Sequence, residues 1–194
     1  DGSLRWEMSE LIKADPARST RGMDEPTFAE LSDGRVLAVL RGSNQTKSQL
    51  PAYRWASWSK DGGRTWTAPE PWTYEDGTNF FSPSSCSQLV PHSSGRLFWI
   101  GNIAPTNAEG NRPRYPLVIG EVDSRTGRLL RRTVRPIDDR SPGDGEMLSL
   151  SNFSAREDRA TGEIVVNLSR LFQRSRPGET DWTSDAYVYR VPVR

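Results

Sequence analysis

The chain has 194 residues, of which 26 are basic and 25 are acidic, so its net charge is only +1. This balance argues against nucleic acid as a partner, because proteins that bind the phosphate backbone usually carry a basic excess. One cysteine and one histidine exclude an intrachain disulfide and a two-histidine zinc site built from this chain alone. No apolar run reaches the length of a membrane-spanning helix.

Glycine (16) and proline (14) are plentiful, hydrophobic residues make up only 34%, and long stretches with helical periodicity are missing. This composition favours many short strands joined by turns. The first predicted hairpin joins Thr27–Leu31 to Val36–Arg41 through a Ser-Asp-Gly turn. Apolar and β-branched residues on both sides of a turn glycine are typical of a hairpin. A third strand, Tyr53–Trp58, then leads into a polar turn at Ser59–Trp66.

The same order of elements recurs along the rest of the chain. A hairpin around a glycine turn is followed by a strand, a second turn and a short partner strand. The later predicted strands are Cys86–Val90, Arg96–Ile100, Leu117–Asp123, Arg128–Leu130, Leu148–Ser154, Glu163–Leu168 and Ala186–Val193. The last of these is expected to be a third strand with no fourth strand after it.

The turn glycines Gly34, Gly95 and Gly162 lie 61 and 67 residues apart, which sets the period of the repeat. Each repeat contains about four strands, and four-stranded sheets repeated around an axis are the blades of a β-propeller. We therefore predict an all-β fold with about three four-stranded blades, which form one partial propeller domain over residues 1–194. Its expected parts are 1–22 (the end of a preceding blade), 23–82 and 83–140 (two blades) and 141–194 (an incomplete last blade).

The turn at Ser59–Trp66 reads S-K-D-G-G-R-T-W and has the form of an Asp box, S-x-D-x-G-x-T-W. In such a turn the aspartate accepts amide hydrogens, glycine allows a left-handed backbone, and tryptophan packs the turn onto the blade. The spacing from Asp61 to Trp66 recurs from Asp1 to Trp6. We therefore expect the sequence to begin inside an Asp box, with Leu4–Met8 as an outer strand, and to be half of a six-bladed ring.

With these motifs the chain resembles the sialidase (neuraminidase) superfamily, in particular the C-terminal half of bacterial BNR-repeat proteins. The resemblance runs through 25–41, 84–102 and 111–123 and continues from Ser151-Asn152-Phe153. It implies a sialidase-like propeller that acts on an acidic sugar or glycan, without a cofactor or a metal. It also implies a secreted or periplasmic protein. The expected partner, besides the sugar, is the missing N-terminal half of the propeller or a second copy of the chain.

Enzymes of this superfamily hold the substrate carboxylate with three arginines and use a tyrosine nucleophile activated by a glutamate, with an aspartate as acid and base. The resemblance places that glutamate at Glu25 and the second arginine at Arg41. The third arginine is matched best by Arg114, with Arg112 as a close rival. Glu25 is thus the expected catalytic residue, and the three arginines are the expected substrate-binding residues.

The sequence departs from the family where the nucleophile is expected, just before the third hairpin. Residues 145–150 read G-E-M-L-S-L and contain no tyrosine. Glu146 is a possible replacement, although a solvated loop charge is the simpler interpretation. The first arginine and the acid aspartate belong to the N-terminal half in this family and lie outside the sequence.

Three functions therefore stay open: a glycoside hydrolase for acidic sugars, a carbohydrate-binding propeller without catalysis, and a propeller for structure or protein interaction. Convergence of Glu25, Arg41 and Arg114 on one pocket favours the first, and the missing tyrosine favours the second. Other features are weaker. The acidic residues at 138–139 and 144–146 lack the regular spacing of a calcium loop. Trp58 and Trp72 are candidates to stack on a sugar, although packing is the commoner role for both, and Trp99 is expected in the core.

Overall fold

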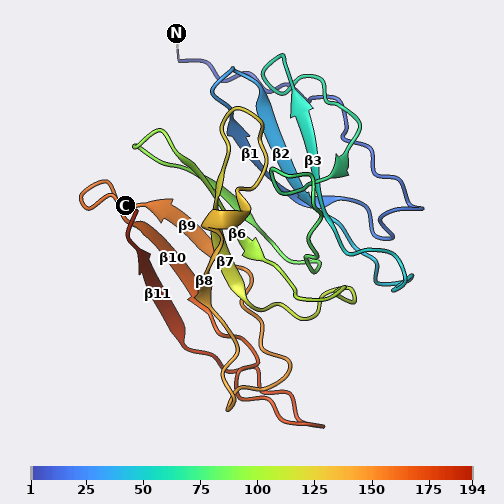
Figure 1. Cartoon of the computed structure of the whole chain (residues 1–194), viewed down its shortest axis with the longest axis vertical. Helices are drawn as coiled ribbons and strands as arrows, with labels where there is room; N and C mark the ends of the chain where they lie inside the picture. The colour runs from blue at the N-terminus through green and yellow to red at the C-terminus, as the bar shows by residue number, and fades with distance from the viewer. Residues whose placement is uncertain (1, 194) are drawn as a thin grey trace.

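The computed structural model describes residues 2–193 and confirms the all-β prediction. Helical structure within these residues is limited to one 3₁₀ turn, η1 (Arg131–Thr133). The strands form three separate antiparallel sheets in the radial order of propeller blades (Figure 1). The first sheet contains β1 (Asp24–Glu30), β2 (Val36–Arg41), β3 (Arg54–Ser59) and β4 (Glu70–Pro71); the second contains β5 (Gln88–Pro91), β6 (Leu97–Asn102), β7 (Leu117–Val122) and β8 (Arg135–Asp138); the third contains β9 (Ser154–Glu157), β10 (Ile164–Ser169) and β11 (Ala186–Val191).

Each sheet is a simple meander in which neighbours in sequence pair in space. The orders are β1-β2-β3-β4, β5-β6-β7-β8 and β9-β10-β11. The second strands of the first two sheets, β2 and β6, are buried on both faces, which explains their nearly continuous apolar sequences. In β2 the four residues from Leu37 to Leu40 are all buried, and in β6 all six residues are.

The innermost strands join one sheet to the next. Strand β1 contacts β5, and β5 contacts β9. Side chains span the gaps: the Leu89 amide donates to Thr27 Oγ1 at 2.8 Å, and the Gln88 amide group bonds the Ala155 backbone at 2.6 and 2.8 Å. The three sheets therefore fan out from a shared inner edge and remain unclosed, as expected for part of a propeller.

Two apolar clusters fill the wedges between the sheets. One joins the first sheet to the second and contains Trp72 and Trp99, whose exposed fractions are 1% and 0%. The other joins the second sheet to the third and contains Ile100, Leu117 and Ile164. Trp99 thus lies in the core as predicted. Trp72 is a core residue too, and its indole N–H donates to the carbonyl of Gly127 at 2.7 Å.

Three predicted strands are wrong. Residues 4–8 form no strand, because no strand in the described part of the chain lies beside them to pair with. Residues 128–130 make only isolated bridges, since Leu129 is buried in the first cluster and the fourth strand forms later, as β8. Residues 148–153 form a loop whose apolar side chains Leu148 and Leu150 enter the second cluster, and the strand begins at Ser154.

The Asp box at Ser59–Trp66 has the predicted hydrogen bonds. Asp61 accepts from the amides of Arg64 (3.1 Å) and Thr65 (2.9 Å), from the Thr65 hydroxyl (2.7 Å) and from the Ser59 hydroxyl (2.7 Å). The Thr65 amide and the Ser59 hydroxyl are the main reasons why the pKa of Asp61 lies well below its usual value. Asp1, the aspartate of the other proposed Asp box, lies outside the described residues.

Replacement of Asp61 by alanine is expected to lower the melting temperature at neutral pH. A carboxylate whose folded pKa is depressed contributes stability above its unfolded pKa of about 3.9, and this contribution is lost as the pH falls below that value. The difference in melting temperature between the wild type and Asp61→Ala should therefore shrink between about pH 4 and pH 2. Thermal unfolding followed by circular dichroism checks this, with Asp139→Ala as a control on an exposed aspartate. A difference that is constant with pH would contradict the proposed role of the carboxylate.

Candidate functional site

Glu25 and Arg41 lie together where β1 begins and β2 ends. Arg41 donates to Glu25 Oε1 at 3.1 Å and to Asp24 Oδ2 at 2.6 Å. The Glu25 side chain is 42% exposed, while that of Arg41 is only 11% exposed. Glu25 sits in an irregularity of the β1–β2 ladder with a φ of +46°. A non-glycine residue in this conformation is strained, and such strain is often stored at functional sites.

Arg114 reaches the same region from the loop before β7. It donates to the carbonyl of Ser84 at 2.8 Å, and its Nε is buried and has no hydrogen-bond partner among residues 2–193. Burial lowers the pKa of Arg114, and nearby Glu25 raises it whereas nearby Arg41 lowers it further. The structure thus brings Glu25, Arg41 and Arg114 within electrostatic reach of one another.

Arg112 and Glu146 lie at the edge of this group. Both are exposed, and together with Arg114 they line a cavity of about 110 Å³. Arg112 and Glu146 also line a larger hollow of about 1080 Å³, which includes Tyr115. Glu146, the residue near the expected position of the tyrosine, is therefore a neighbour of the two rival arginines.

Arg54 is the residue of this region that the sequence interpretation missed. It opens β3, pairs in register with Arg41 and is completely buried. Its guanidinium donates to the hydroxyls of Ser82 and Ser85 at 2.9 Å each and to the carbonyl of Ser85 at 2.5 Å, while Nη1 is buried without a partner. Burial lowers its pKa to about 10, against an opposing effect of Cys86 and Glu25. The signal available in the sequence was its place near the start of the predicted strand Tyr53–Trp58, which follows the strand that ends at Arg41.

Two further side chains hold the loops of this site. Asn102, at the end of β6, donates from Nδ2 to the carbonyls of Arg114 (3.1 Å), Pro116 (3.0 Å) and Leu150 (3.1 Å). Cys86 Sγ accepts the amide of Asn152 at 3.0 Å, and Asn152 has a φ of +59°. The loops before β5, β7 and β9 are thus bound to one another around the arginines.

The acidic residues near 138 and 144 have a structural role in this structure. Asp144 pairs with Arg170 at 2.6 Å, and Asp138 accepts from Arg170 and from the Tyr189 hydroxyl. Within residues 2–193, no group of three histidine, cysteine, aspartate or glutamate side chains is placed to hold a metal ion. The helical content of the same residues includes no segment long and apolar enough to cross a membrane.

Substitution of Arg54 by lysine is expected to destabilise the fold by about 1–3 kcal/mol, because an ammonium group cannot reproduce the three bonds of the planar guanidinium and leaves buried acceptors unpaired. Chemical unfolding measures this difference. Arg159→Lys, on an exposed arginine, is the matched control and should have no measurable effect. Equal stability of the two variants would show that the buried guanidinium does not hold the loop at 82–86.

Comparisons with known proteins agree with this architecture. The BNR repeat-like domain family matches residues 1–139. The NanB sialidase of Streptococcus pneumoniae superposes with a TM-score of 0.54 at 19% identity, over 85% of this chain and 22% of that chain. The endo-1,5-alpha-L-arabinanase of Thermotoga petrophila RKU-1 superposes with a TM-score of 0.54 at 16% identity, over 80% of this chain and 36% of that chain. The Trypanosoma rangeli sialidase superposes with a TM-score of 0.52 at 15% identity, over 86% of this chain and 23% of that chain.

The chain therefore spans between about a fifth and just over a third of the length of these structures. Their similarity shows that the chain shares the fold of these sialidase and arabinanase structures. No curated protein matches the chain.

Proposed function

Because the chain belongs to the BNR repeat-like domain family, we propose that it contributes part of the substrate site of a glycoside hydrolase for acidic sugars, of the exo-sialidase type. The observation that carries the proposal is the convergence of Glu25, Arg41 and Arg114 at one end of the first two sheets. The glycoside hydrolase fold supports it.

The chemistry of this group suits a sugar carboxylate. Guanidinium groups bind carboxylates with two parallel hydrogen bonds, which fix orientation as well as charge. The guanidinium of Arg41 already pairs with two carboxylates, those of Asp24 and Glu25, so this group is positioned to bind anions. Arg114 has a buried Nε without a partner. A carboxylate that bridges these two arginines would be recognised by charge and by shape.

Glu25 has the role of a general base in this proposal. Its side chain is the most exposed member of the group, so it can accept a proton from a nucleophile, while Arg41 fixes its orientation. The nucleophile in this scheme is a water molecule that gives its proton to Glu25. Glu146, which shares the cavity of about 110 Å³ with Arg114, would be a second carboxylate that stabilises positive charge on the sugar ring. The acid aspartate and the first arginine would come from blades outside this chain or from a second copy.

The additional blades or the second copy would also cover apolar side chains that are exposed on this chain. Leu4, Trp6 and Met8 are 82%, 90% and 91% exposed. We propose that further blades, or a second copy, pack against this segment. A secreted or periplasmic location belongs to the same proposal and rests on the family resemblance.

A carbohydrate-binding propeller without catalysis is the second candidate, and one observation favours it. The loop at 145–150 lacks the tyrosine nucleophile. In this case the arginines would still bind the sugar carboxylate, but no glycoside would be cleaved.

Replacement of Glu25 by glutamine in the full-length protein is expected to lower kcat on an acidic glycoside by about 10²–10⁴-fold, because the amide cannot accept the proton. Binding of the sugar should be retained. A panel of fluorogenic sialic acid, uronic acid and neutral glycosides measures this. Glu30→Gln, on an exposed glutamate of the same strand, is the matched control.

Loss of turnover in Glu25→Gln but not in Glu30→Gln would support the hydrolase. Sugar binding without any turnover by the wild type would support the second candidate. Equal turnover by both variants would contradict the role of Glu25.

A further inference from the structure

A second hollow lies at the opposite end of the first sheet, beside the Asp box. It has a volume of about 560 Å³, in the range typical of small-molecule sites. Arg35, in the turn before β2, lines this hollow, whereas Arg41 ends the same strand at the first site. Six residues of β2 therefore separate the two places by roughly 20 Å. The two sites are distinct.

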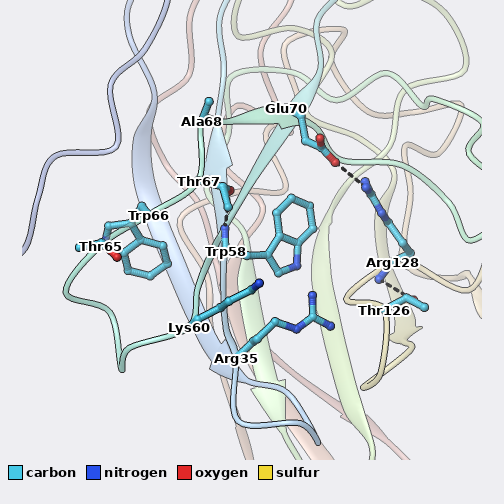
Figure 2. A pocket seen from close by; sticks show the side chains of 10 residues that line it. All are labelled: Arg35, Trp58, Lys60, Thr65, Trp66, Thr67, Ala68, Glu70, Thr126 and Arg128. Carbon is cyan, nitrogen blue, oxygen red and sulfur yellow. Dashed lines mark hydrogen bonds and ion pairs between the residues drawn. The ribbon is translucent and has the colours of Figure 1, made fainter.

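Basic side chains from both of the first two sheets meet in this hollow. Arg35 and Lys60 come from the first sheet and Arg128 from the second, and Glu70 is the only acidic residue among the lining residues (Figure 2). Glu70 pairs with Arg128 at 2.5 Å. Arg35 is paired with Asp33 as well, so the charge that the carboxylates of the described residues leave unpaired is that of Lys60, and an anion would be attracted to it.

The two arginines are held in place by the protein, whereas the lysine is not. Arg35 pairs with Asp33 at 2.7 Å and donates to the carbonyl of Arg125 at 2.6 Å. Lys60 is exposed and, within the described residues, has no hydrogen-bond or ion-pair partner. Its ammonium group points toward Arg35 and Trp58 in Figure 2 and is free to bind a ligand.

An aromatic ring completes the site. Trp58 is half-buried at the centre of the lining, and the Arg128 guanidinium lies 5.0 Å from its ring centre. Figure 2 shows the indole between Arg128 on one side and the ends of Arg35 and Lys60 on the other. The indole is thus fixed by packing and by a cation–π contact, and a fixed aromatic ring is a suitable surface for the apolar face of a sugar. Hydroxyls of Thr65, Thr67 and Thr126 also line the hollow.

We propose that this hollow is a second binding site for an anionic sugar, a saccharide ring that bears a carboxylate or a sulfate group. The ring contacts Trp58, and the anionic group binds Lys60 and Arg35. A neutral sugar would leave Lys60 without a partner, and a simple anion would leave the indole unused. The site would hold an acidic polysaccharide at a distance from the reaction centre, and it does not depend on the role of Glu25.

Calorimetry on the full-length protein tests the proposal with three probes of equal length: a uronate oligosaccharide, a sulfated oligosaccharide and a neutral one. Lys60→Glu reverses an exposed charge, and Lys47→Glu reverses another exposed lysine as the matched control. We expect an acidic probe to bind, and Lys60→Glu to raise its Kd about tenfold. Lys47→Glu and Arg41→Lys should leave this affinity unchanged, the latter because it weakens carboxylate binding at the first site alone. The acidic probe that binds more tightly identifies the anionic group.

Three results would overturn the proposal: no binding of either acidic probe, equal affinity for the neutral probe, or the same Kd in Lys60→Glu and Lys47→Glu. Unchanged binding in an Arg41→Lys protein, whose first site no longer holds the sugar carboxylate, would show that the second site exists apart from the first. Loss of binding in Arg41→Lys would assign the binding to the first site and contradict the second.

Discussion

The buried guanidinium of Arg54 ties the first sheet to the loop that leads into the second. It binds Ser82 and Ser85 within that loop. The next contacts depend on this loop: the carbonyl of Ser84 accepts from Arg114, and Cys86 Sγ accepts the amide of Asn152. One side chain in the first sheet thus positions groups from the second and third.

This arrangement explains why the candidate site lies at the junction of the sheets and not within one of them. Glu25 and Arg41 lie at the ends of rigid strands, whereas Arg114 and Glu146 lie in loops. Strain at Glu25 and unpaired nitrogens on Arg54 and Arg114 are concentrated in the same region. A folded chain tolerates such features where the surrounding packing fixes them.

The sequence was sufficient for the parts of the fold that local chemistry determines. Glycine turns, alternating strands and the Asp box are properties of neighbouring residues, so the first two hairpins were predicted close to their observed places. The strand at 148–154 was misplaced because buried Leu148 and Leu150 resemble strand residues, although they fill the wedge between two sheets. That role depends on packing between blades, which a local pattern does not contain.

The candidate site shows the same difference between what neighbouring residues determine and what packing between blades determines. Glu25 and Arg41 follow from one predicted hairpin together with the family resemblance. Recognising Arg54 as part of the site requires the strand register and the position of a loop about thirty residues away. The different surroundings of Arg112 and Arg114 depend on the path of the loop that carries them, since one is exposed and the other reaches Ser84.

The arginines at the junction of the sheets are proposed to hold the carboxylate of a sugar. The most direct test compares the affinity of a sialic acid or uronic acid glycoside with that of its methyl ester. Both affinities are measured in the full-length protein that carries Lys60→Glu, so that the second hollow does not contribute to the binding. We expect the free acid to bind at least about tenfold more tightly than the ester, because a charged hydrogen-bond pair is lost on esterification. Arg41→Lys should remove most of this difference. Equal affinities for acid and ester would contradict the claim.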